Sequence, residues 1–229
     1  RVINTLRYKA NGVGYADVRP RYVWLLDVET GEAARITDWE CDEISPVFSP
    51  DGNRLAFVSE GKRTSGVDLG PEVWVVELST GRTTQVSDNG PCSLPAWSPC
   101  GEKIAYFANP DDISAANTRL YITSADGESK WVTADFDRSM GNSMASDIKY
   151  RGVQSGPSWA ADGNKVYFVA TDGGHAGLFS VSLTQWLIEG VVNIPDFSIV
   201  SFDIAQGMIA YCGGTHTNPG DVFVGPNHR

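Results

Sequence analysis

The part of this sequence that comes closest to a catalytic motif is Gly141–Ala145, which reads GNSMA and approximates the G-x-S-x-G turn that carries a nucleophilic serine. Such a turn needs an apolar strand before it and an amphipathic helix after it. Here Ser143 lies in a polar segment, so we do not expect it to be a nucleophile. The three histidines give no general base, because none has a recognisable nucleophile and orienting carboxylate beside it. They are His175, His216 and His228. We therefore predict no catalytic residue in this chain.

Metal and cofactor chemistry is also absent from the sequence pattern. Carboxylates gather in Asn109–Ser114 and in Asp135–Ser139, but neither stretch has the spacing of a calcium loop. Solvated loop carboxylates are the better interpretation. No Cys/His spacing typical of zinc occurs, and no cofactor motif is present. We predict no metal and no cofactor.

Three residues remain as candidates for contact with a substrate. Arg138 and Arg151 bracket the longest polar segment, and either guanidinium could pair with a peptide carboxylate if that segment overhangs a pore. The alternative is an arginine that anchors a loop or is simply solvated. His175 lies in the glycine-rich sequence DGGHAG, where a surface imidazole is the alternative to a substrate contact.

Charge and composition limit the possible partners. The chain of 229 residues has 18 Lys and Arg against 28 Asp and Glu, a net charge of −10, and it contains no basic run. Nucleic acid and anionic membranes are therefore poor partners. No apolar stretch is long enough to span a bilayer. The four cysteines are far apart, which favours isolated thiols and a reducing, cytoplasmic location.

The elements that would position any site are set by a repeat. FSPDGNRLAFVS at Phe48–Ser59 returns as WSPCGEKIAYFA at Trp97–Ala108 and as WAADGNKVYFVA at Trp159–Ala170. Each copy predicts a strand, a tight turn that ends at a glycine, and a second strand. A second phrase, such as VWVVELSTGRTTQVS at Val73–Ser87, predicts another hairpin after each first one; the copy at Leu178–Val192 has lost its turn glycine.

Two hairpins in series make a four-stranded antiparallel unit, and four turn glycines mark successive units. Gly52, Gly101, Gly163 and Gly207 lie 49, 62 and 44 residues apart, close to the period of about 40–50 residues of a propeller blade. We predict an all-β protein, a β-propeller of about four blades or an open part of a larger one. Residues 1–229 would form a single propeller domain or fragment. Its blades would cover roughly residues 1–37 (partial), 45–87, 94–133, 156–192 and 199–226 (partial).

Strand direction places the connections on two faces. We expect the first-to-second and third-to-fourth turns of each blade to be tight and to share one face. The other connections are predicted to be long and to share the opposite face, where a substrate or partner would bind. They are Gly61–Pro71, Asn109–Thr118, Ala134–Ser155 and Thr171–Gly177.

The two ends of the chain read as incomplete blades. Tyr22–Thr37 has outer strands without an inner hairpin, and the last residues read as an inner hairpin followed by DVFVG. Either the ends complete one blade together or the propeller is an open arc, whose unpaired edges would favour homo-oligomers. We expect the chain to be a piece of a longer polypeptide. Recurring tryptophans at positions 24, 74, 97 and 159 are expected to pack between blades.

These phrases, with the opening RYKANGVGY and the closing HTNPGDVFV, resemble the propeller half of prolyl oligopeptidase family serine peptidases, nearest the acylaminoacyl-peptidase branch. The resemblance covers nearly the whole chain. It departs from the pattern at Cys100, which replaces the turn aspartate, and at Ala160 and Ala161, which replace Ser-Pro. Neither change puts a role in doubt, because the turn tolerates both.

The resemblance implies a parent enzyme in which a seven-bladed propeller covers an α/β-hydrolase domain and filters access to a Ser-Asp-His triad. This chain would be a non-catalytic scaffold and gate, inactive alone, with the hydrolase domain and short peptides as its partners. Size selection by a narrow pore needs no titrating residue. The alternative is a stand-alone binding propeller of the Tol-system kind, which would hold a protein partner on its long-loop face.

Overall fold

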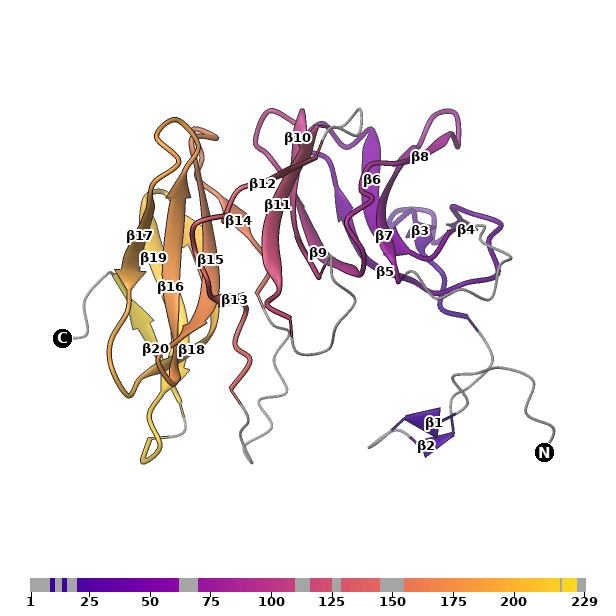
Figure 1. Ribbon diagram of the computed structural model, residues 1–229. Helices are drawn as coiled ribbons and strands as arrows, with labels where there is room; N and C mark the ends of the chain where they lie inside the picture. Colours follow the sequence, from indigo (N-terminus) through magenta and orange to yellow (C-terminus); the bar gives the residue numbers. More distant parts are fainter. Residues whose placement is uncertain are drawn as a thin grey trace.

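The computed structural model describes residues 9–10, 14–15, 20–61, 70–109, 116–124, 129–144, 155–218 and 220–225. Within these ranges the chain is all-β, and its sheets are antiparallel blades in a propeller arrangement (Figure 1). The predicted fold class is thereby confirmed. No helix in the described part of the chain is long and apolar enough to cross a membrane.

Two blades have the predicted four strands. The first contains β5 (Glu43–Phe48), β6 (Arg54–Ser59), β7 (Glu72–Glu77) and β8 (Thr83–Gln85). The second contains β9 (Cys92–Trp97), β10 (Lys103–Ala108), β11 (Arg119–Ser124) and β12 (Ser129–Trp131). Their middle strands are buried almost throughout.

The remaining sheets depart from four strands. The third blade contains β14 (Ser158–Trp159), β15 (Lys165–Asp172), β16 (His175–Ser182) and β17 (Ile188–Val192), and β13 (Ser139–Met140) pairs with the end of β15. The fourth has β18 (Ser198–Ala205), β19 (Met208–Gly214) and β20 (Asp221–Val224). Ahead of these blades lie two pairs, β1 (Lys9–Ala10) with β2 (Gly14–Tyr15) and β3 (Trp24–Leu26) with β4 (Ala33–Arg35).

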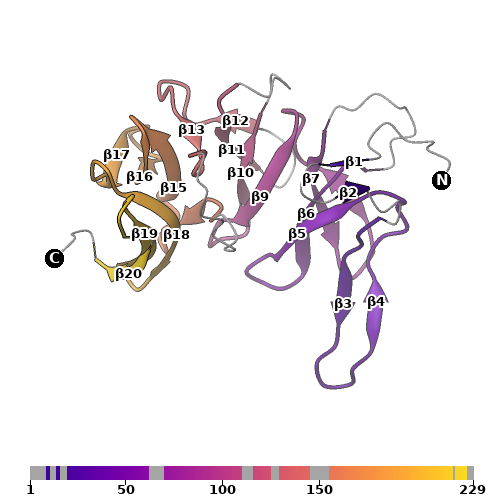
Figure 2. The same cartoon turned by 90° about the horizontal axis from the view of Figure 1, so that it is seen from below.

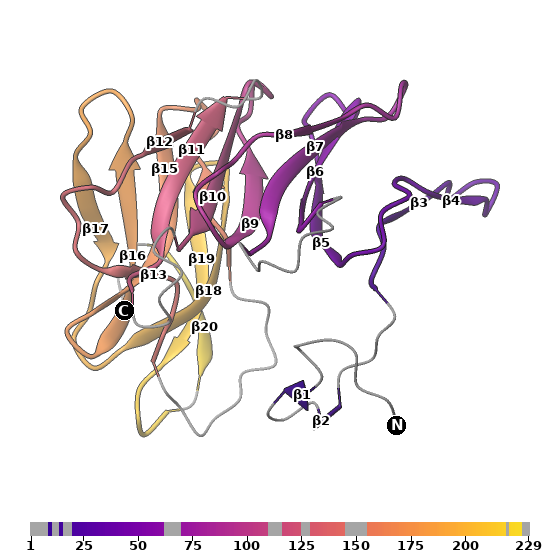
Figure 3. The ribbon, with the colours of Figure 1, turned by 45° about the vertical axis from the view of Figure 1, so that its right-hand side comes forward.

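The blades follow one another along an arc. Figure 2 shows the β3–β4 sheet at one end and the β18–β20 sheet at the other, and Figure 3 shows β3–β4 at an edge of the molecule beside the first blade. The two end sheets are separate, so the described strands do not complete one blade together. Trp24 on β3 is 58% exposed, which corrects the expectation that it packs between blades: no described sheet covers that side of β3.

The first turn of each blade has the predicted chemistry. In the first blade the Gly52 amide donates to Ser49 O at 2.9 Å, and Gly52 has φ of +72°. Gly101 and Gly163 repeat both the contact and the conformation in the next two blades. A positive φ is readily adopted only by glycine, which explains why this residue recurs while the rest of the turn varies.

The third-to-fourth turns also keep one geometry, including the copy without glycine. Gly81 has φ of +69° and its amide donates to Glu77 O at 2.8 Å. In the third blade Trp186 takes the same place, with φ of +56°, and its backbone amide donates a hydrogen bond to Ser182 O at 2.8 Å. The surrounding hairpin therefore imposes on a tryptophan a conformation that bulky side chains disfavour.

The turns divide into the two predicted faces. The described first-to-second and third-to-fourth turns of the blades lie at the top in Figure 1, here called the tight-turn face. The opposite ends of the strands, at the bottom, form what is here called the long-loop face. One expectation is wrong: Thr171–Gly177 is not a long loop. Residues 171–172 and 175–177 belong to strands β15 and β16, which a two-residue turn joins.

A separate apolar core fills each contact between neighbouring sheets. Leu55 and Phe57 of the first blade pack with Val23 and Trp39, which come from the segments that flank β3–β4. Tyr106 and Trp97 belong to the core between the first and second blades. Two further cores follow along the arc, around Phe168 and then around Ile199. Two tryptophans join neighbouring blades directly, as predicted. The indole of Trp97 donates to Val47 O at 3.2 Å, and that of Trp159 donates to Ala96 O at 3.0 Å.

Candidate functional site on the long-loop face

The turn end of the β15–β16 hairpin, here called the hairpin end, brings together Arg138 and His175, the two substrate-contact candidates that the structure describes. Asp172 ends β15, His175 begins β16, and the two residues are cross-strand partners. Between them Gly173 and Gly174 have φ of +55° and +92°. Positive φ at both central positions is the requirement of the type I′ turn that joins twisted strands most tightly.

Arg138 lies against the β15 side of this end. Its Nε is 2.5 Å from Asp172 Oδ1, and its Nη1 donates to Asp137 O at 2.7 Å. The segment that carries it is fixed by Phe136, whose ring packs against Phe179 at a centroid distance of 5.1 Å. The Arg138 side chain nevertheless remains 44% exposed, so a guanidinium held in position by its own ion pair also faces solvent.

His175 lies on the β16 side and contacts Asn193, which follows β17. The imidazole Nε2 is 2.6 Å from Asn193 Oδ1. A Cβ at Gly177 would lie 2.6 Å from that same oxygen, so glycine at 177 leaves room for the amide of Asn193. The imidazole is thus held by an amide rather than by a carboxylate.

Ser143 lies nearby but is not part of a catalytic arrangement. Its amide and its hydroxyl both donate to Thr171 Oγ1, at 2.9 and 3.0 Å, and the Thr171 hydroxyl donates to Gly141 O. No imidazole contacts Ser143 within the described part of the chain. The sequence expectation needs one amendment, because the short strand β13 does precede Ser143.

The remaining candidates from the sequence are the other two histidines, the second arginine and the possible metal ligands. His216 is exposed in the connection between β19 and β20. Arg151 and His228 lie outside the described residues. In the ranges that are described, no three or more His, Cys, Asp or Glu side chains form a group that could hold a metal ion.

Two members of this hairpin end were not anticipated, Asp172 and Asn193. For Asp172 the signal was present: Asp-Gly or Gly-Gly between alternating apolar residues is the strongest short-range sign of a two-residue hairpin. Asn193 has no such sign, because its contact with His175 depends on how β17 pairs with β16. Together Arg138, Asp172, His175 and Asn193 form a polar surface whose side chains can donate and accept hydrogen bonds.

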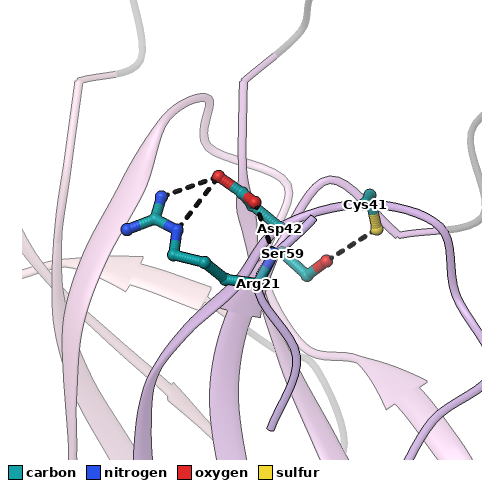
Figure 4. A network of polar contacts seen from close by, with 4 residues as sticks. All are labelled: Arg21, Cys41, Asp42 and Ser59. Carbon is teal, nitrogen blue, oxygen red and sulfur yellow. Dashed lines mark hydrogen bonds and ion pairs between the residues drawn. The ribbon is translucent and has the colours of Figure 1, made fainter. Parts of the chain in front are cut away.

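The thiols of Cys92 and Cys41 are not activated. Burial, and then the nearby Glu72 carboxylate, raises the pKa of Cys92 far above its ordinary range. Burial also raises the pKa of Cys41, whose Sγ lies 3.1 Å from Ser59 Oγ (Figure 4). A raised pKa suppresses the thiolate, which is the nucleophilic form.

The ion pair beside Cys41 has a structural role. The Arg21 guanidinium lies 2.7 Å from Asp42 Oδ2, and the Arg21 amide donates to Asp42 Oδ1 at 2.9 Å (Figure 4). Burial alone would raise the pKa of Asp42, but these hydrogen bonds and the charge of Arg21 together lower it. The pair fixes the chain ahead of β3 to the start of the first blade.

Comparison with known proteins gives related matches of two kinds. No protein-family model matches the chain. A TolB homologue of Chlorobium chlorochromatii is 27% identical over 148 residues, which cover 65% of this chain and 28% of the homologue. The uncharacterised peptidase YuxL of Bacillus subtilis is 26% identical over 194 residues, covering 83% of this chain and 29% of the peptidase.

Among solved structures, an acylaminoacyl peptidase of Pyrococcus horikoshii aligns with a TM-score of 0.66 and 16% identity. The alignment covers 97% of this chain and 32% of the peptidase. At this identity the likeness establishes the fold. The chain spans less than a third of the length of the first curated relatives that it matches. The resemblance recognised in the sequence is therefore found again in the comparisons: the chain is a propeller similar to those of peptidases of the prolyl oligopeptidase type and to TolB propellers.

Proposed function

We propose that this chain is the non-catalytic propeller segment of a serine peptidase of the prolyl oligopeptidase type, nearest the acylaminoacyl peptidases. It admits short peptides to a hydrolase domain of the parent protein and excludes folded proteins. The observation that supports the proposal is the share of this chain that each match covers. The match to the YuxL peptidase extends over 83% of this chain, whereas the match to the TolB homologue extends over 65%.

The geometry of the long-loop face is consistent with a gate. Arg138 and His175 present a guanidinium and an imidazole, and each is already oriented by a partner side chain. Peptide carboxylates and carbonyls are the groups that such side chains bind. Exclusion by size is steric and depends on the rigidity of the blades.

The proposal is tested on the natural polypeptide. An antibody raised against this chain would isolate the parent protein, and a fluorophosphonate probe would then report a reactive serine. Labelling of a polypeptide longer than 229 residues, together with hydrolysis of acylated short peptides, is the expected result. A parent protein that the probe does not label would overturn it.

A second candidate function is a binding propeller of the Tol-system kind, favoured by the match to the TolB homologue. The same isolation separates the two. A binding propeller would be unlabelled by the probe and would retain one protein partner in a fixed stoichiometry after crosslinking.

The two ends of the arc support a further part of the proposal, self-association when the chain is isolated. Val222 and Val224 on β20 are 66% and 67% exposed, and Trp24 and Leu26 are exposed on β3. Exposed apolar edge strands favour pairing with another chain. Sedimentation of the isolated chain is expected to show association that depends on concentration, and a strictly monomeric species would contradict this.

A further inference from the structure

A cleft of about 360 Å³ opens on the tight-turn face between the first turns of the second and third blades. Its walls include Lys103 and Glu102 from one turn and Trp159, Asp162 and Gly163 from the other. The cleft lies on the opposite face from Arg138 and His175, so it is separate from the site proposed above.

The equivalent space one blade earlier is filled by the protein itself. Arg54 extends from the first blade into the turn of the second, where its Nη2 donates to Gly101 O at 2.6 Å. Its guanidinium lies 4.7 Å from the centre of the Trp97 ring. Beneath this guanidinium Trp97 is only 7% exposed, and Gly101 is buried.

The framework around the two spaces is the same. Trp97 and Trp159 end the first strand of their blades, and each indole donates to a carbonyl of the preceding blade, Val47 O and Ala96 O. Gly101 and Gly163 share the left-handed conformation, with φ of +73° and +70°. The repeat therefore provides an aromatic face and a turn carbonyl at both places.

The side chain available to fill the space differs, because the second blade has Lys103 at the repeat position where the first blade has Arg54. The Lys103 side chain is exposed, while Trp159 and Gly163 remain half-buried instead of covered. Lysine lacks the planar fork that stacks on an aromatic ring and donates in several directions. The cleft is the volume that Arg54 fills at the preceding contact.

The charge of the cleft suits a cation of that shape. Glu102 and Asp162 contribute two carboxylates, against the one ammonium of Lys103. Asp162 accepts from the amide and the side chain of Asn164, which hold its carboxylate at the turn. The net charge of −10 further favours a basic ligand.

We propose that this cleft binds the guanidinium group of an arginine side chain presented by a peptide or protein. The group would stack on Trp159 and donate to the Gly163 carbonyl, as Arg54 does at Trp97 and Gly101. We infer the class of ligand from Arg54, whose guanidinium fills the equivalent space one blade earlier.

The probe is N-acetyl-arginine methylamide, with the lysine compound as its counterpart, titrated into the isolated chain. Indole ¹H–¹⁵N signals identify the tryptophan that responds. The Trp159 signal is expected to shift with saturation, and the lysine compound is expected to bind on the order of tenfold more weakly, since stacking and planar donation are lost. Equal binding of both compounds, or no shift at Trp159, would overturn the proposal.

Two reciprocal variants test the comparison between the clefts. Lys103→Arg should fill the cleft from within the chain, weaken arginine binding about tenfold, and raise Tm by about 2–4 °C. Arg54→Lys should open the earlier cleft and give the Trp97 signal a new response. Lys165→Arg, at the same repeat position in the third blade, is the control and should leave binding unchanged. Retained binding in folded Lys103→Arg protein would count against the site.

Discussion

The hydroxyl of Ser87 donates to the carboxylate of Glu72 at 2.6 Å, and both residues are buried between the first and second blades. The same hydroxyl accepts from the Val73 amide at 2.8 Å. Ser87 therefore joins the end of the fourth strand to the beginning of the third. Thr37 and Thr133 stand at the same place in their repeats; Thr37 contacts Glu43, and Thr133 accepts from the Leu120 amide.

Replacing this hydroxyl is expected to destabilise the protein. Ser87→Ala removes a donor from a buried carboxylate and an acceptor from a buried amide, which should lower the free energy of unfolding by about 1–3 kcal/mol. Urea unfolding measures the change. Thr84→Ala, at an exposed position on β8, is the control and should stay within about 0.5 kcal/mol of the parent sequence. If both variants lost the same free energy of unfolding, the buried hydrogen bonds of Ser87 would contribute no more to stability than the exposed Thr84 hydroxyl.

The first turn predicts a specific pH dependence. Hydrogen bonds from the Ser49 hydroxyl and then from Asn53 lower the pKa of Asp51 to about 2, from its ordinary value of 3.8. Since the folded pKa is the lower one, this stabilisation is fully present above about pH 4 and is lost as the pH falls through about 2.

Asp51→Asn should therefore be less stable than the parent sequence at pH 5, and the difference should shrink toward pH 2. Urea midpoints across this range measure it. Asp162→Asn should behave in the same way, because hydrogen bonds from Asn164 lower the pKa of Asp162 in the equivalent turn. A difference that does not vary with pH would contradict the assignment.

The second blade has Cys100 where the neighbouring turns have aspartate. Ser98 Oγ lies 3.4 Å from Cys100 Sγ, whereas Ser49 Oγ lies 2.5 Å from Asp51 Oδ1. Cys100→Asp should restore the charge-assisted bond and stabilise the protein by about 0.5–1.5 kcal/mol at pH 7. The gain should disappear in the Ser98→Ala background, and thermal unfolding of the four proteins in this cycle measures it.

A glycine in the last blade is required by close packing. A Cβ at Gly213 would lie 2.5 Å from the Phe197 ring and 2.8 Å from Ser198 O. Gly213→Ala should cost about 1–3 kcal/mol through overpacking. Gly190→Ala is the matched strand control, because the nearest atom to its Cβ lies at 3.4 Å. Chemical denaturation would show whether the two variants differ as expected.

Arg138 offers a test of the proposed gate in the proposed parent peptidase. If its guanidinium binds a peptide carboxylate, Arg138→Ala should raise KM for short peptides by about 10–100-fold, the equivalent of a charge-assisted hydrogen bond of about 1.5–3 kcal/mol, and leave kcat unchanged. Arg82→Ala, at an exposed site on the tight-turn face, is the control. An unchanged KM would show that Arg138 does not bind substrate and that its role is the ion pair with Asp172.

Sequence reasoning succeeded where the determinants are local. The turn around Gly52 is defined within six residues, so its repetition predicted the blades. The Arg138–Asp172 pair joins residues 34 positions apart and exists only because β13 lies beside β15. Trp186 shows the opposite case, in which the hairpin around it outweighs its own backbone preference.

The apolar interior is divided into separate cores along the arc, and this division determines how stability is distributed over the chain. A defect near Ile199 removes contacts from the last interface and leaves those around Phe57 intact. Stability then accumulates as a sum of nearest-neighbour terms along the arc, as in other repeat proteins. Amide exchange should accordingly be slowest in β10 and its neighbours, which have a sheet on each side, and faster toward both ends.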